Sequence, residues 1–426
     1  MQGRDQAEPM STAGPREGEI RQPSKGELQS TSMMTTVTIS RLREAIPKHC
    51  FDRSATKSIA YLARDLILIA ILAWSAFTVI PTIQSNWARF VLWQIYGFVQ
   101  GLVGTGLWII AHECGHGAFS ANQTLNDWCG LFGHSLLLVP YHSWRITHHR
   151  HHNFVAHMDK DTAFVPRRVE EKTSTNPIIG SRLRTFLESA EDTPAFVLIQ
   201  LLGHQFLGWP LHMVFNLSAG SKSAPDGVRL GIFNSSHFLP LGGLFTRAQW
   251  KKVLISDVGL VCVLSALHLF QQAFGTQMVL QMYFVPWFWV HHWLIAVTYL
   301  HHNHIDVPHF EDESWTFVKG ASSTIDRDFG FIGEHLFHNI IETHVVHHFF
   351  PKIPFYHARE ATRAIRPVLG ESYNRDTTNL LVALWSTFRR CTFMEEVPSK
   401  DGSSMVRVWV KETLIVLDNL INASSN

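Results

Sequence analysis

The sequence shows no paired cysteines, no dominant charge and no cleavable signal segment. Its five cysteines are odd in number and widely scattered, which argues against a disulfide scaffold and for a reducing environment. The formal net charge is only +1, so the basic surplus typical of nucleic-acid-binding proteins is missing, and we expect no nucleic-acid partner. Residues 1–40 contain no apolar run that could form the core of a signal peptide. Their polar composition predicts a disordered tail instead.

Long apolar stretches are what the sequence does have. Hydrophobic residues make up 46% of the chain, and four segments approach the ~20 residues that a membrane-crossing helix needs. These segments are residues 66–83, 90–111, 253–274 and 279–300. We therefore predict an all-α integral membrane protein with four transmembrane helices, in a domain over residues 41–395 that is followed by a C-terminal tail over residues 396–426.

The distribution of basic residues predicts the orientation. Several lysines and arginines precede the first span, whereas the turn at 84–89 contains only Arg89, so the N-terminus is expected in the cytosol. The connection 112–252 is also basic. The connection 112–252 and the hydrophilic segment that follows residue 300 are therefore both expected on the cytosolic side, where they form a helical cap. Two further apolar stretches, 128–141 and 195–217, are too short or too polar to span and are expected to lie along the membrane surface.

Histidines occur in three groups with helical spacing. The groups are His112 and His116; His148, His151 and His152; and His344, His347 and His348. A spacing of three or four residues places the side chains of each group on one face of a helix. Eight imidazoles exceed the needs of one catalytic zinc ion, which usually has three protein ligands and a water, so we predict two metal ions. Imidazole binds Zn, Cu, Fe and Ni alike, so the ligand type leaves the metal open.

Two other functions fit parts of this pattern. The run from His112 to His116 also satisfies His-Glu-x-x-His, in which a zinc protease would use Glu113 as general base. That alternative leaves most of the other histidines without a role. A metal transporter or sensor would place its ligands near the membrane midplane, whereas none of the three groups lies within a predicted span.

Four motifs resemble those of the membrane fatty acid desaturases. They are His-Glu-Cys-Gly-His-Gly-Ala-Phe-Ser at 112–120, Thr-His-His-Arg-His-His at 147–152, Thr-Ile-Asp-Arg-Asp-Phe-Gly at 324–330 and Thr-His-Val-Val-His-His-Phe-Phe-Pro at 343–351. The sequence is most similar to the acyl-lipid branch, the Δ12 and ω3 enzymes, and the similarity covers about residues 40–390. Mixed Δ12-like and ω3-like features leave the position of the new double bond open.

The resemblance implies a non-haem centre of two iron ions with histidine ligands. The eight histidines of the three groups match the family's ligands, and a ninth is expected near the end of the fourth span. His302 fits that place best, with His301 and His304 as competitors. His149 is expected to point away from the shared face. Carboxylates that could orient the ligand rings are Asp159, Asp161, Asp326, Asp328 and Glu342.

The resemblance also implies the reaction and its partners. It predicts an oxidoreductase of the endoplasmic reticulum membrane that introduces a cis double bond into an already unsaturated acyl chain, carried by a phospholipid or by CoA, with O2 as oxidant. Electrons are expected from cytochrome b5 and its reductase as separate proteins, since neither tail contains a His-Pro-Gly-Gly haem motif. Hydroxylation, acetylenation and formation of conjugated bonds on the same scaffold are the alternatives.

Overall fold

The computed structural model describes residues 37–173, 193–225, 228–399 and 402–410. Most of the predicted N-terminal tail and the end of the predicted C-terminal tail, residues 1–36 and 411–426, lie outside the described residues.

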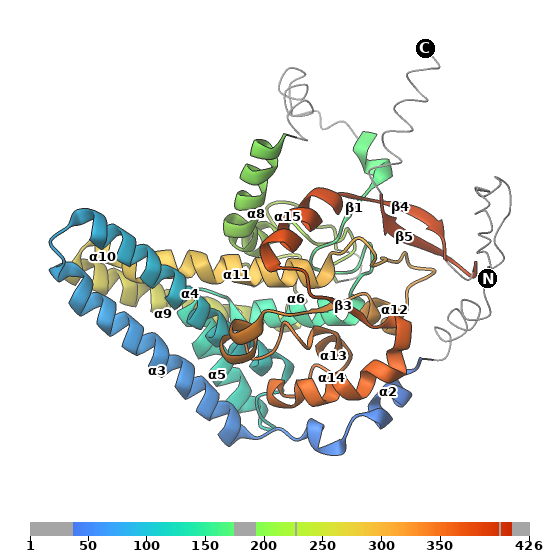
Figure 1. Ribbon diagram of the computed structural model, residues 1–426, viewed down its shortest axis with the longest axis horizontal. Helices are drawn as coiled ribbons and strands as arrows, with labels where there is room; N and C mark the ends of the chain where they lie inside the picture. Colours follow the sequence, from blue (N-terminus) through green and yellow to red (C-terminus); the bar gives the residue numbers. More distant parts are fainter. Residues whose placement is uncertain (1–36, 174–192, 226–227, 400–401, 411–426) are drawn as a thin grey trace, which may run out of the picture. The chain divides into compact units, whose positions relative to one another are not determined.

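Five long helices give the protein its framework: α3 (Ala55–Val79), α4 (Asn86–His116), α8 (Pro194–Phe215), α9 (Trp250–Phe274) and α11 (Val285–His302). Figure 1 shows α3, α4, α9 and α11 extending together toward one end, where the short α10 also lies, with the strands and most of the other helices gathered at the other end. The shorter helices are α2 (Ile39–Ala45), α5 (Gln123–Leu136), α6 (Tyr141–Phe154), α10 (Thr276–Val279), α12 (Phe317–Ser322), α13 (His344–Phe349), α14 (Phe355–Leu369) and α15 (Leu380–Arg390).

Three helical segments of the described chain are long and apolar enough to cross a membrane: Ala55–Thr82, Asn86–His116 and Arg247–Phe274. In the first and third, only 17% of the apolar window is buried in the protein, against 83% in the second. The first and third segments therefore present apolar side chains outward, as helices in contact with lipid do. Helix α4 runs through the interior and packs against α3, α5 and α11.

The predicted fourth span, residues 279–300, is not among these three segments. A π-helical turn, η5 (Leu280–Phe284), separates α10 from α11, and buried residues such as His291 and Trp293 occupy much of α11. Four transmembrane helices are therefore not confirmed. The stretch predicted to lie along the membrane surface, residues 195–217, forms helix α8, which is also outside the set of three.

The protein is mostly helical, as predicted, but the described chain also contains two small sheets that the prediction of an all-α protein left out. Strands β1 (Arg167–Arg168), β4 (Phe393–Pro398) and β5 (Met405–Trp409) form one sheet, in which β1 and β4 run parallel and β4 and β5 antiparallel. The other sheet pairs β2 (Ile325–Arg327) with β3 (Asn374–Asp376) in parallel. The expected domain boundary at residue 395 falls inside β4. Residues 405–409, which were expected in a tail, form β5.

Short helical turns complete the described chain. They are η1 (Lys48–Phe51), η2 (Ile80–Thr82), η3 (Val169–Thr173), η4 (Arg247–Gln249), η6 (Ile332–Leu336) and η7 (Gly370–Ser372).

Candidate metal centre

The first histidine pair lies in the last turn of α4. Ser85 caps the start of this helix, where its side chain accepts the N–H of Ala88, and Gly117 caps its end. The φ angle of Gly117 is +71°, a left-handed conformation that glycine adopts without the steric cost a Cβ brings. The helix therefore stops directly after His116, with His112 and His116 on one face near the end of the apolar bundle.

The second and third groups lie on helices whose first N–H groups are satisfied by other elements. In α6, the His142 N–H donates to Ser256 of α9 at 2.8 Å. In α13, the Val345 N–H donates to Asp326 at 2.8 Å, and the Tyr373 hydroxyl donates to the other oxygen of Asp326 at 2.7 Å. A helix of six residues is too short to be stable alone. Asp326 therefore holds α13 in place from the neighbouring strand β2.

Five histidines form the first cluster, with ligand atoms all within 4.8 Å of one another: His112, His116, His148, His152 and His347. The Nε2 atoms of His112, His116 and His148 lie 3.0 to 3.2 Å apart. The Nε2 of His152 lies 3.1 Å from that of His148.

Four histidines form the second cluster. Ligand atoms of His151, His302 and His348 lie within 4.8 Å of one another. The Nε2 of His344 is 3.1 Å from those of both His302 and His348. The two clusters touch where the rings of His152 and His348 stack with their centroids 4.2 Å apart. The structure thus brings together all nine histidines predicted from the sequence.

The nitrogen contacts themselves indicate that a cation belongs here. The Nε2 of a neutral imidazole either carries a proton and donates, or carries a lone pair and accepts. In the triangle of His112, His116 and His148, the three mutual contacts cannot all be hydrogen bonds, because at least two of the three atoms would have the same role. A metal ion removes this conflict, because it accepts the lone pairs of all the rings at once.

The electrostatics favour neutral rings, as metal ligation requires. Burial lowers the pKa of His347 to about 3. Burial, together with the neighbouring imidazoles, holds the pKa values of His148, His152, His344 and His348 well below their usual range. At neutral pH each of these rings therefore keeps one nitrogen with a lone pair that a metal ion can bind.

The candidates for the ninth position are clearly separated. His302 faces into the second cluster. His301 stacks on His344 at 3.9 Å and its Nε2 faces the Ile341 carbonyl, whereas His304 lies beside Asp306 and Asp376. His149 is exposed, as predicted.

Among the predicted carboxylates, Asp161 alone contacts the ring of one of the nine histidines in the described chain. One of its oxygens lies 2.6 Å from Nδ1 of His151, and the other accepts the Ala156 N–H at 2.9 Å. The other four carboxylates bind backbone N–H groups or basic side chains: Asp159, Asp326, Asp328 and Glu342.

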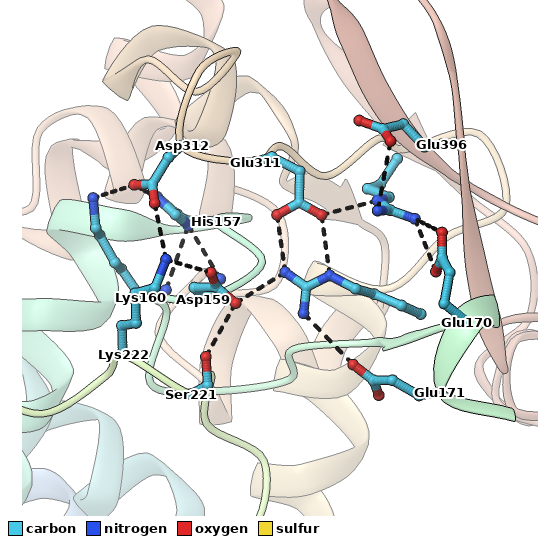
Figure 2. A network of polar contacts seen from close by, with 12 residues as sticks. His157, Asp159, Lys160, Glu170, Glu171, Ser221, Lys222, Glu311, Asp312 and Glu396 are labelled. Carbon is cyan, nitrogen blue, oxygen red and sulfur yellow. Dashed lines mark hydrogen bonds and ion pairs between the residues drawn. The ribbon is translucent and has the colours of Figure 1, made fainter. Parts of the chain in front are cut away.

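A network of ion pairs anchors the loop that carries Asp161 (Figure 2). Arg168 donates two hydrogen bonds to Glu311 and one to Asp159. Nε2 of His157 lies 3.1 Å from Asp312, which also pairs with Lys222. Because the network holds both ends of the segment 157–168, it fixes the position of Asp161 between them.

A buried pair before the third group joins His338 to helix α3, with the His338 Nε2 2.7 Å from Asp65. Arg64 donates to the other oxygen of Asp65. His338 and Asn339 both have positive φ angles, so the Asp65 contact fixes a turn that bulky residues rarely adopt, shortly before α13.

Aromatic rings that the sequence analysis did not assign to the site cover the clusters. Trp144 stacks on His148 with centroids 4.4 Å apart, and Trp108 stacks on His112 at 5.4 Å. Each tryptophan precedes its histidine by four residues, a spacing that could have indicated the contact. Phe164 stacks on His302 at 5.9 Å. These two residues are far apart in the sequence, so no helical spacing could have indicated this contact.

A cavity of about 920 Å³ leads to both clusters. Its lining includes the apolar residues Ile109 of α4, Leu207 of α8 and Leu294 of α11, together with histidines of both clusters. The volume is at the upper end of the range for binding sites of small molecules.

The fatty acid desaturase family model matches residues 85–378. The chain belongs to the fatty acid desaturase family. An oleate hydroxylase of Claviceps purpurea is 41% identical over 86% of this chain and 78% of its own length. Two Δ12 desaturases, from Vernicia fordii and Trichosanthes kirilowii, are 39% and 37% identical, over 87% and 88% of this chain and 90% and 96% of their own lengths.

As a member of this family the protein is an oxidoreductase that acts on acyl lipids. The zinc protease alternative finds no support in the site. Glu113, its required base, accepts the N–H of Phe355 at the start of α14, which is a structural contact.

Proposed function

We propose that this desaturase introduces a cis double bond into an unsaturated acyl chain, of the kind that oleate provides, at a centre of two iron ions. The observation that carries the proposal is the mostly apolar cavity whose lining includes histidines of both clusters. The names of the Δ12 desaturases it resembles support an oleate-type substrate and a bond in the Δ12 region.

In this proposal the nine histidines hold the metals. His112, His116, His148, His152 and His347 hold one ion, and His151, His302, His344 and His348 hold the other. Bound iron with O2 supplies the oxidising strength that removal of hydrogen from an unactivated methylene requires, which no side chain can provide. The chain's own residues position the ligand rings and shield them from water. Asp161 orients the His151 ring. Trp108 and Trp144 keep water from the adjacent histidines.

The remaining parts of the proposal concern supply and location. We infer that cytochrome b5 and its reductase deliver the electrons and that the histidine side of the protein faces the cytosol, at the endoplasmic reticulum. Support comes from the basic residues before the first span and from the three apolar helices.

Hydroxylation is the second candidate, and one observation favours it. The oleate hydroxylase is more similar to this chain, at 41% identity, than the two Δ12 desaturases described above. Desaturation removes two hydrogens from adjacent carbons, whereas hydroxylation places an oxygen atom on one carbon, so the products distinguish the two functions.

Expression in a yeast that makes only monounsaturated fatty acids tests both candidates. Mass spectrometry of the fatty acids should show a new diene, absent when His347→Ala is expressed at the same level. A hydroxylated monoene as main product would establish the second candidate. Unchanged fatty acids in cells with iron-loaded, folded protein would contradict both.

A further inference from the structure

A second group of potential metal ligands lies where the start of the described chain meets α14. His49 and Cys50 belong to the turn η1, while His357 and Glu360 lie in the first two turns of α14. One ligand atom from each of the four side chains lies within 4.8 Å of the others. None of these residues belongs to the nine-histidine centre.

The distances approach those of a tetrahedral site. Nε2 of His49 lies 2.9 Å from a carboxylate oxygen of Glu360 and 3.8 Å from Sγ of Cys50. Zinc bonds of about 2.0 Å to nitrogen or oxygen and about 2.3 Å to sulfur place neighbouring ligand atoms roughly 3.3 to 3.6 Å apart. Small side-chain adjustments therefore suffice to coordinate one ion.

The charges of the four ligands also match a divalent cation. One thiolate and one carboxylate neutralise the ion, and two imidazoles add no charge. Neutrality matters because Cys50 is fully buried in an apolar cluster that includes Leu42 and Ile365.

A surface ion pair does not account for this arrangement. The side chains of His49 and Glu360 are 54% and 50% exposed, and pairs so exposed contribute little to stability. Such a pair also gives no reason for a buried thiol and a second imidazole to meet at the same point.

We propose that His49, Cys50, His357 and Glu360 bind a structural zinc ion, separate from the nine-histidine centre. The ion connects η1, which leads into α3, with α14, which follows the third histidine group and packs against α13. It thereby fixes η1 against the segment that carries His344, His347 and His348.

Cobalt(II) provides the test, because cobalt bound to a thiolate has a charge-transfer absorption that imidazole ligands alone cannot produce. We expect full-length protein that is produced in zinc-depleted medium, loaded with iron and held in detergent to develop this absorption when titrated with cobalt chloride, and to lose it when zinc is added; zinc content is measured on protein produced in ordinary medium. Cys50→Ser should abolish the absorption and lower the zinc content by about one ion per chain. Cys391→Ser is the matched control, since Cys391 is also buried but lies in none of the candidate ligand groups of the described chain.

A second pair of variants keeps the test decisive if Cys50→Ser does not fold. His49→Ala and Glu360→Ala change half-exposed side chains, so both should fold and bind cobalt at least about ten-fold more weakly. The absence of a thiolate band in the unmodified protein, or a band and zinc content unchanged in all three variants, would overturn the proposal.

Discussion

The Nδ1 atom of His151 lies 2.6 Å from Asp161, and both side chains are buried. This contact fixes the ring so that Nε2 points toward His302 and His348. Asp161→Asn keeps the shape but removes the charge that holds the ring. We expect product formation or bound iron to fall by about 10- to 100-fold, measured by fatty-acid analysis and by iron content per chain.

Asp328→Asn serves as the control for this change. Asp328 is half-exposed and lies 3.5 Å from Arg375, so its removal should leave iron and product unchanged. Equal effects of the two substitutions would show that Asp161 acts on overall stability and not on His151.

The ninth position can be tested with two nearby histidines. His302→Ala removes a ring from the second cluster and should abolish product and lower bound iron. His304→Ala should leave both nearly unchanged, because His304 pairs with carboxylates outside the cluster. Full activity of the His302 variant would remove that residue from the proposed ligands.

The adjacent residues His148 and His149 offer a similar comparison. His148 contributes to the first cluster, whereas His149 is exposed. We expect His148→Ala to produce no diene and His149→Ala to produce nearly the normal amount in the same yeast assay. Inactivity of both variants would indicate that any substitution in helix α6 disturbs the protein, so that the loss of activity in His148→Ala would not depend on the position of His148 in the cluster.

The cavity can be filled without disturbing its wall. Gly203 of α8 lines the cavity, and a Cβ atom there would meet nothing within 4 Å. Gly203→Phe should lower conversion of long acyl chains more than that of shorter ones, in cells fed fatty acids of different length. Gly203→Ala, which improves helix propensity by about 1 kcal/mol, should remain fully active. Unchanged chain-length preference in the Phe variant would place the acyl chain elsewhere.

His309 predicts a pH dependence of stability. Burial lowers its pKa to about 3, so below the unfolded value of about 6.5 the unfolded state binds a proton that the folded state does not. The free energy of unfolding should therefore fall with decreasing pH between those values, by about 1.4 kcal/mol per pH unit from this group. His309→Phe should show a shallower loss of thermal stability from pH 7 to pH 5. Replacement of the exposed His335 by Phe should leave the slope unchanged, and parallel curves for wild type and His309→Phe would contradict the assignment.

The three histidine groups could be predicted from the sequence because helical spacing determines which side chains share a face, whereas His302 was expected only from the family resemblance. The same reasoning could not select Asp161 among five carboxylates, since that choice depends on how the segment after α6 returns to the cluster. Long-range ion pairs such as Arg168 to Glu311 determine this return. Nothing local in the sequence indicates their partners.

The errors in the predicted fold have similar causes. Strands β1, β4 and β5 contain two to six residues, too few to establish an alternating pattern, and β1 pairs with a segment more than 200 residues away. Apolar composition also cannot distinguish a helix in lipid from one enclosed by protein. Helix α11 shows this, because much of its apolar surface is covered by α4 and α8.

The pairing of Asp65 with His338 has a consequence for biosynthesis. The two residues are 273 positions apart, so at ~5–20 residues per second the ribosome needs roughly 14 to 55 seconds to deliver the imidazole after the carboxyl group. During that interval Asp65 lacks the histidine that pairs with it in the folded protein, and Arg64 is its remaining ion-pair partner. The contact that joins helix α3 to the turn before α13 therefore forms late in synthesis. A polypeptide that ends before residue 338 could not form it.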